Sequence, residues 1–261
     1  MKPRLFIFGL GYSASRIAQA AERDGWEVVS TGRAGTLSFD DAGAVRLALA
    51  DADQIVSSVP PDGTGVDPVL EQYGAALAGK RLTYLSSTGV YGDCGGAWVD
   101  ESAATGTGRR SARSEADAAW LARGARVLRL PGIYGPGRSA LDRVRAGRAQ
   151  RIDLPGQVFS RVHVDDIVSG AMLALEAPAG AYNLADDLPA SQNAVIEHAC
   201  QLLCAPPPHL VSLEAAQLSP AARGFYNENR RVANAKAKRV LGWTLRYPTY
   251  RGGLAALAAS A

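Results

Sequence analysis

The sequence has few cysteines and little excess charge. Only three of its 261 residues are cysteine, namely Cys94, Cys200 and Cys204. Their odd number fits a reducing compartment better than a disulfide framework, and their spacing predicts no metal site. The formal net charge of +3 is too small to indicate a nucleic-acid partner without a clustered basic face.

Long hydrophobic runs are also absent. No apolar stretch approaches the roughly 20 residues that cross a bilayer, and the first residues show no signal-peptide pattern. We therefore expect a cytoplasmic protein without a membrane partner. The apolar fraction of 47% argues against disorder, and the length suits one large α/β domain with a small appended lobe.

Short apolar segments alternate with helix-like segments through the first half of the chain. Strands are predicted at 4–8, 26–30, 54–59, 81–86 and 126–130, and helices at 14–24, 44–50, 67–79 and 111–123. This alternation predicts βαβ units and an α/β fold with a doubly wound parallel sheet, the NAD(P)-binding Rossmann fold.

Two segments break the alternation and predict a second structural unit. We expect residues 1–135, continued by 160–204, to form the dinucleotide-binding core. Residues 136–159 and 205–261 are expected to form a small substrate-binding lobe over the carboxyl edge of the sheet, where α/β sheets bind ligands.

The first strand leads into a glycine-rich turn, Gly9-Leu-Gly11-Tyr12-Ser13-Ala14. In this G-x-G-x-x-A pattern the first glycine permits the tight turn and the second lets the backbone approach a pyrophosphate. The alanine is small enough for the helix to pack on the strand. The strand before and the helix after it predict a dinucleotide site, and a glycine turn used only for packing is the alternative.

The end of the second strand indicates which cofactor binds. No acidic residue that would hold the ribose hydroxyls of NAD(H) occurs between Val28 and Thr36. Arg33 can instead contact a 2′-phosphate, with Thr31 as a further hydroxyl donor. NADP(H) is therefore the preferred cofactor, with NAD(H) as the second choice and a solvated loop arginine as the alternative reading of Arg33.

Three hydroxyl residues, Ser86, Ser87 and Thr88, end a central strand. Such groups can hold a substrate carbonyl beside a nicotinamide, although runs of Ser and Thr are more often turn formers. The run Ser-Ser-Thr-Gly-Val-Tyr-Gly resembles the extended short-chain dehydrogenase/reductases, the NAD-dependent epimerase/dehydratase family. Other segments resemble that family in the same order: the glycine loop and residues 129–137, 162–167 and 234–243.

The resemblance implies roles for particular residues. Ser87 matches the family's catalytic Ser/Thr, and Pro131 to Tyr134, including Ile133, would line the nicotinamide. Val59, Pro60 and Pro61 would shape the adenosine-ribose side. In Val162-His-Val-Asp-Asp166, helix capping by Asp165 or Asp166 is favoured over chemistry by His163.

The chain departs from the family at its catalytic Tyr-x-x-x-Lys pair. The aligned positions hold Arg109 and Arg113. Arginine is a poor acid or base because it stays protonated, although Arg113 can still bind ribose hydroxyls. Tyr134 is then the first candidate proton donor, Tyr91 the second, and His163 and Tyr226 are remote candidates.

The arginines of the expected lobe have two interpretations. Either they form a phosphate or carboxylate subsite or they make a solvated helix face: Arg138, Arg143, Arg145, Arg148, Arg151, and with similar ambiguity Arg230, Arg231 and Asn234.

The leading hypothesis is an NAD(P)-dependent oxidoreductase or epimerase-like enzyme acting on a small, nucleotide-linked or sugar-like substrate. The alternative is a redox-inert NADP(H)-binding regulator or sensor. A homodimer through helices 67–79 and 111–123 is a further prediction.

Overall fold

A computed structural model describes residues 2–108 and 111–260. Within them a six-stranded parallel sheet has the order β10-β6-β4-β3-β1-β2. The strands are β1 (Arg4–Phe8), β2 (Glu27–Ser30), β3 (Gln54–Ser57), β4 (Arg81–Ser87), β6 (Arg126–Leu130) and β10 (Gly180–Asn183). This sheet confirms the predicted doubly wound α/β fold.

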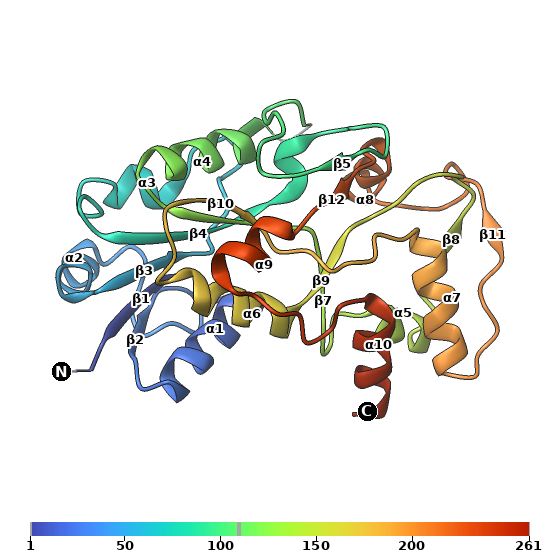
Figure 1. Ribbon diagram of the computed structural model, residues 1–261, viewed down its shortest axis with the longest axis horizontal. Coiled ribbons are helices and arrows are strands. Elements are labelled where there is room, and N and C mark those ends of the chain that lie inside the picture. The colour runs from blue at the N-terminus through green and yellow to red at the C-terminus, as the bar shows by residue number, and fades with distance from the viewer. Residues whose placement is uncertain (1, 109–110, 261) are drawn as a thin grey trace.

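Helices cover both faces of the sheet (Figure 1). One face holds α1 (Tyr12–Arg23), α6 (Val164–Ala174) and α9 (Ala235–Leu241), and the other holds α2 (Ala42–Asp51), α3 (Pro68–Tyr73) and α4 (Ser111–Ala122). Alternate residues of β1 feed the two cores, because successive strand side chains point to opposite faces. Leu5 and Ile7 join the α1 side, and Phe6 and Phe8 join the α3 side.

The strand order reverses between β1 and β3. The chain leaves β1 for β2 on one side and returns to β3 on the other, which opens a crevice at their carboxyl ends. The expected strand 54–59 ends early, at Ser57, so residues 58–61 leave the sheet at this crevice. The glycine loop after β1 lies at the same point.

A smaller lobe lies beyond the carboxyl edge of the sheet (Figure 1). It contains α5 (Ala140–Arg145), α7 (Gln192–Leu202), α8 (Pro220–Gly224), α10 (Tyr250–Ala259) and three short parallel strand pairs. The pairs are β5 (Trp98–Val99) with β12 (Arg231–Val232), β7 (Gly132–Tyr134) with β9 (Arg161–His163), and β8 (Arg151–Ile152) with β11 (Leu210–Val211). Two 3-10 turns, η1 (Thr88–Tyr91) and η2 (Phe225–Asn227), complete the description.

The packing differs from the expected core and lobe at two places. Helix α7, expected in the core, shares an apolar cluster with α5 and α10 of the lobe. Helix α9, expected in the lobe, packs on the sheet together with Trp243, whose Nε1 donates to the carbonyl oxygen of Asp166 at 3.0 Å. The buried apolar face of each helix, rather than its position in the sequence, decides which part of the molecule it packs against.

Two smaller observations concern helix lengths. The helix expected over 67–79 stops at Tyr73 and continues as turns. Among the described residues, no helix is long and apolar enough to span a membrane.

Candidate functional site

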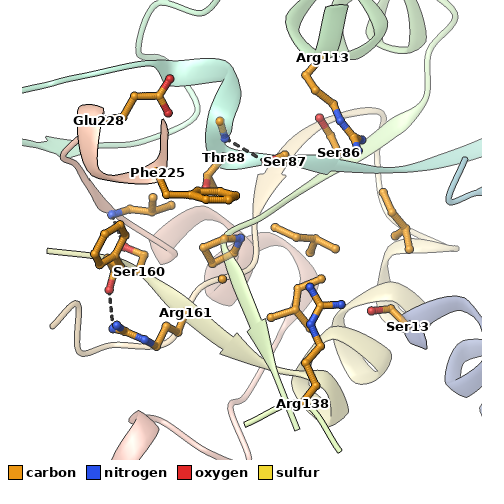
Figure 2. A pocket seen from close by; sticks show the side chains of 18 of the residues that line it. Ser13, Ser86, Ser87, Thr88, Arg113, Arg138, Ser160, Arg161, Phe225 and Glu228 are labelled. Carbon is orange, nitrogen blue, oxygen red and sulfur yellow. Dashed lines mark hydrogen bonds between the residues drawn. The ribbon is translucent and has the colours of Figure 1, made fainter. Parts of the chain in front are cut away.

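A cavity of about 660 Å³ lies between the carboxyl edge of the sheet and the lobe (Figure 2). It gathers many of the predicted site residues from segments far apart in the sequence: Gly11, Tyr12, Ser13, Ala14, Pro60, Ser86, Ser87, Thr88, Arg113, Pro131 and Ile133. Gly9, Thr31, Arg33, Val59, Pro61 and Tyr134 do not line it. The loops after β1, β3, β4 and β6 therefore meet at one wall of the cavity.

The N-terminus of α1 faces this cavity with unoccupied backbone donors. Its N-cap is Gly11, no side chain caps it, and its first turn carries no acidic residue. A Cβ built on Gly11 would have no heavy atom within 4 Å, so the space in front of the helix is open. An anion such as a pyrophosphate fits there, because free N–H groups and the helix dipole both favour negative charge.

Buried polar contacts fix the turn before α1. Gly9 adopts φ +78°, its amide donates to Thr31 Oγ1 at 3.2 Å, and its carbonyl accepts from Ser58 Oγ at 2.6 Å. Thr31 is only 1% exposed. The expectation that Thr31 contacts a cofactor phosphate is therefore corrected: its hydroxyl holds the glycine turn in place.

Arg33 lies in an exposed turn after β2. Within the described residues its guanidinium makes no hydrogen bond or ion pair. A Cβ on Gly32 would meet the amide nitrogen of Leu10 at 2.9 Å, so this turn packs directly on the glycine loop. Arg33 thus follows directly after a residue that packs on the glycine loop, although it does not line the cavity.

The three hydroxyls after β4 have different surroundings. Ser86 is buried and donates to Asp117 Oδ2 at 2.6 Å. Thr88 is also buried, whereas Ser87 is half-buried and its Oγ accepts from the amide of Gly89 at 3.1 Å. Ser87 is therefore the hydroxyl whose own proton is best placed to reach a bound carbonyl.

A buried ion pair lies behind Ser86. Arg129 donates to both carboxylate oxygens of Asp117, at 3.1 and 2.7 Å, and to the Tyr91 hydroxyl at 2.9 Å. That hydroxyl in turn donates to Asn183 Oδ1 at 2.8 Å. The proposal of Tyr91 as a proton donor is corrected here, since its phenol is fully used in a network that joins β4, α4, β6 and β10.

Tyr134 is not placed to act as a proton donor. Its hydroxyl is buried in the lobe, where a Cβ on Gly253 of α10 would overlap it. Burial raises the pKa of Tyr134 far above its ordinary value, and the nearby carboxylates of Asp186 and Asp166 raise it further. This expectation is also corrected, because a core phenol that lies outside the cavity cannot exchange protons with a ligand there.

His163 and the two acids after it are structural, although not in the expected way. His163 itself caps α6, with Nδ1 accepting from the amide of Asp165 at 3.1 Å, and burial lowers its pKa. Asp166 accepts from the backbone amides of Arg246 and Tyr247 at 2.6 and 3.2 Å. The histidine, rather than Asp165 or Asp166, is the cap, and Asp166 fastens the C-terminal segment to α6.

Of the two arginines predicted to take the place of a Tyr-x-x-x-Lys pair, only Arg113 lies among the described residues. Arg113 extends from α4 toward Ser86 at the cavity wall (Figure 2). Arg109, which aligns with the family's tyrosine, lies outside the described residues. Across the described lining the phenols are those of Tyr12 and Tyr226, and the Tyr12 hydroxyl donates to the carbonyl of Pro136 at 3.1 Å.

The lobe supplies lining residues that sequence reasoning missed or left undecided. Phe159, Ser160, Arg161, Phe225 and Glu228 were not considered, while Arg138, Arg143, Tyr226 and Arg230 had only an ambiguous assignment. Their positions depend on long connections between the sheet and the lobe. The cluster of arginines in residues 138–151 was the sequence feature that pointed to this part of the lining, and it identified only some of the lining residues.

The arginines of residues 138–151, together with Arg230, Arg231 and Asn234, have several different surroundings. Arg138 and Arg143 line the cavity, whereas Arg145 lines a second hollow and Arg151 pairs with Glu197 at 2.5 Å. Among the later residues, Arg230 lines the cavity and pairs with Glu228 at 3.0 Å. Arg231 donates to the carbonyl of Gly96, and Asn234 donates to the carbonyl of Ala185 at 2.7 Å.

Comparison of the sequence with protein-family models gives no match. One curated relative, a 3-diazoavenalumate denitrifying reductase from Streptomyces, is 36% identical over 140 residues, which are 49% of this chain and 45% of that protein. The Escherichia coli protein YeeZ is 28% identical over 94% of this chain and 96% of its own length. The chain thus matches less than half of the reductase but nearly all of YeeZ.

Solved structures resemble the whole chain. A conserved protein of unknown function from Silicibacter pomeroyi is 38% identical, with a TM-score of 0.88 over 100% of this chain and 99% of that one. Human epimerase family protein SDR39U1 with NADPH has a TM-score of 0.78 at 18% identity, covering 99% and 100% of the two chains. The Bacillus anthracis dTDP-glucose 4,6-dehydratase with NAD has a TM-score of 0.77 at 16% identity, covering 98% and 96%.

Proposed function

We propose that this chain, which belongs to one family with the Silicibacter pomeroyi protein and has the fold of the NAD-dependent epimerase/dehydratase proteins, is an NADP(H)-dependent oxidoreductase for a small substrate. The observation that carries the proposal is the cavity that joins the uncapped N-terminus of α1 to the Ser86–Thr88 hydroxyls. The two similar folds that hold NADPH or NAD support a nicotinamide dinucleotide as the cofactor.

The residues at the site fit such a cofactor. The open space before Gly11 would accept the pyrophosphate, and Arg33 would contact a 2′-phosphate with its exposed guanidinium. Pro131 and Ile133, from the segment after β6, line the same cavity. The bound cofactor would supply hydride transfer, which is its own chemistry, while the protein provides position and polarity.

Reduction is the direction that these side chains support best. Ser87 can donate a hydrogen bond to a substrate carbonyl, and Arg113 adds a fixed positive charge on the same wall. Neither side chain resembles the usual phenol and amine pair, and arginine does not give up its proton near neutral pH. A substrate that accepts hydride with little help from an acid, or that takes its proton from water, suits this site.

The experiment is a turnover assay of the purified chain. NADPH oxidation is followed by absorbance with a panel of small carbonyl, conjugated and diazo compounds, the last prompted by the reductase relative. Cofactor binding is measured separately by NADPH fluorescence. We expect tight NADPH binding, substrate-dependent oxidation and a loss of turnover in Ser87→Ala with cofactor binding retained.

Two outcomes would count against the proposal in different ways. Absence of NADPH and NADH binding would reject the cofactor site itself. Tight NADPH binding without turnover of any compound would instead favour a redox-inert NADP(H)-binding regulator. Threonine at position 87 serves as the control, since Ser87→Thr keeps the hydroxyl and should retain activity that Ser87→Ala loses.

A further inference from the structure

The lobe end of the cavity carries cationic side chains that are poorly compensated. Arg161 is 7% exposed and lines the cavity, yet no carboxylate oxygen lies within ion-pairing distance among the described residues. Its guanidinium instead donates to the carbonyls of Phe159 and Ala190, at 2.8 and 2.9 Å, and to Gln192 Oε1 at 3.3 Å. Burial lowers the pKa of Arg161 to about 10, so it remains charged at neutral pH.

A second arginine faces the same space. Arg143 of α5 lines the cavity, and no hydrogen bond or ion pair joins its side chain to a described residue. Loss of water around its guanidinium lowers the pKa of Arg143. The buried charge of Arg161 is costly without a matching carboxylate, because a charge in the interior loses solvation. Arg143 is exposed on the lining of the same cavity, where its guanidinium stays available to a ligand.

The carboxylates nearby do not cancel this charge. Glu228 is paired with Arg230. Asp186, whose charge raises the pKa of Arg161, has its own pKa raised to about 7 by burial, and it does not line the cavity. Arg143 and Arg161 therefore carry positive charge that no ion pair among the described residues cancels, and an anionic group of a ligand would match it.

The rest of this end of the cavity is aromatic. Phe159 and Tyr226 pack edge to face with ring centroids 5.4 Å apart, and Phe225 is 49% exposed on the same wall. These rings favour a flat, unsaturated ligand over a sugar, whose hydroxyls need polar partners. The available volume also favours a small ligand, since about 660 Å³ must hold the nicotinamide half of the cofactor as well.

We propose that Arg143 and Arg161 form a subsite for the carboxylate of a small planar acid, whose ring lies among Phe159, Phe225 and Tyr226. This inference rests on the proposed function and names the substrate class for the same cavity. A forked guanidinium matches the two oxygens of a carboxylate, so the subsite would hold the acid at one end. The unsaturated end would then extend toward Ser87.

The test is calorimetric binding of trans-cinnamate to the intact chain saturated with NADP+. Cinnamamide, which has the same ring and chain without the charge, is the matched ligand. Arg143→Gln is the main variant because its side chain is exposed to the cavity, and Arg161→Gln is a second one that removes the buried guanidinium. Arg145→Gln is the control, since it lies on the same helix but lines the other hollow.

We expect trans-cinnamate to bind at least tenfold more tightly than cinnamamide. Arg143→Gln should weaken cinnamate at least fivefold and leave cinnamamide unchanged, while Arg145→Gln changes neither. Equal binding of the two ligands, or no cinnamate binding at millimolar concentration, would overturn the proposal. Tighter binding of phenyl phosphate or UDP-glucose that depends on Arg143 would also overturn it, in favour of a phosphate subsite.

NADPH binding, measured first on the same samples, separates this inference from the proposed function. If the chain binds no nicotinamide cofactor, the proposed function fails. If the cofactor binds and cinnamate shows no dependence on Arg143 or Arg161, only the carboxylate subsite fails.

Discussion

Arginines with fixed positive charge line several parts of this site. Arg113 lines the cavity at the position that the sequence resemblance predicts for a lysine, and Arg143 and Arg161 bring further fixed charge to the lobe end. Fixed cations bind and orient anions, but they do not transfer protons at neutral pH. At the residue scale the site is therefore better equipped for binding than for acid–base chemistry.

Arg33 provides the test of cofactor choice. Arg33→Ala should weaken NADPH binding about 10- to 100-fold, the value of a charge-assisted contact of ~1.5–3 kcal/mol, because the exposed guanidinium would lose the 2′-phosphate. NADH binding should stay the same. Fluorescence titration with both cofactors measures the effect, with Arg23→Ala at the far end of α1 as the control. Equal losses for both cofactors would show that Arg33 does not read the phosphate.

Asp186 predicts a pH dependence of stability. Burial is the main cause of the rise in the pKa of Asp186 from 3.8 to about 7. The Leu188 amide and the Arg161 charge lower this pKa, whereas the charges of Asp187 and Asp166 raise it further. The folded chain thus binds a proton that the unfolded chain releases between about pH 4 and 7. The contribution of Asp186 to the free energy of unfolding therefore falls by up to about 4 kcal/mol as pH rises through this window, and it stays constant above pH 7.

The variant Asp186→Asn isolates this effect. The free energy of unfolding of the variant, relative to the natural chain, should rise between pH 4.5 and 7.5. Urea unfolding at several pH values measures the difference, and Asp153→Asn, which changes an exposed carboxylate that is not among the charges acting on Asp186, is the control. A difference that does not depend on pH would contradict an elevated pKa at Asp186.

At the scale of elements, α10 and β7 meet through a glycine. A Cβ on Gly253 would overlap the hydroxyl of Tyr134, whereas a Cβ on Gly252 would meet nothing within 4 Å. This contact joins α10 to β7. Close packing here fixes α10 on β7 within the lobe.

The two neighbouring glycines make a matched pair of variants. Gly253→Ala should lower the free energy of unfolding by about 1–3 kcal/mol through overpacking. Gly252→Ala should raise it by up to about 1 kcal/mol, because alanine is the better helix former. Urea unfolding of both variants measures the contrast. A stability of Gly253→Ala equal to that of Gly252→Ala would show that α10 does not seat against Tyr134.

At the scale of the whole molecule, the cavity couples the sheet to the lobe. Residues from the β1, β3, β4 and β6 loops share it with α5, β9 and η2. A ligand bound there stabilises both parts at once, since it binds the folded chain and not the unfolded one.

Thermal unfolding should report this coupling. NADPH at about 100 times its Kd should stabilise the chain by about 2.7 kcal/mol, which corresponds to a rise of about 5–10 °C in Tm. Gly11→Ala should leave the Tm of the free chain nearly unchanged, because its Cβ meets no atom, yet remove the rise by blocking the pyrophosphate. A full rise in Gly11→Ala would place the cofactor elsewhere.

The sequence by itself determined the parallel sheet and one wall of the cavity. Apolar periodicity predicts strands and helices locally, and the residues that follow each strand gather at one edge because parallel strands share a direction. The glycine loop, the Ser86–Thr88 hydroxyls and Pro131 were therefore placed together correctly. Local pattern also predicted the helix that carries Arg113.

Only the tertiary structure decided which side chains are buried or hydrogen-bonded, and which lobe residues line the cavity. Tyr91 and Tyr134 looked alike in sequence, but one is held by Arg129 and Asn183 and the other is packed against α10. Arg161 entered the cavity through packing of β9 with β7. Burial and hydrogen bonding arise from contacts between distant segments, and no local pattern of residues specifies them.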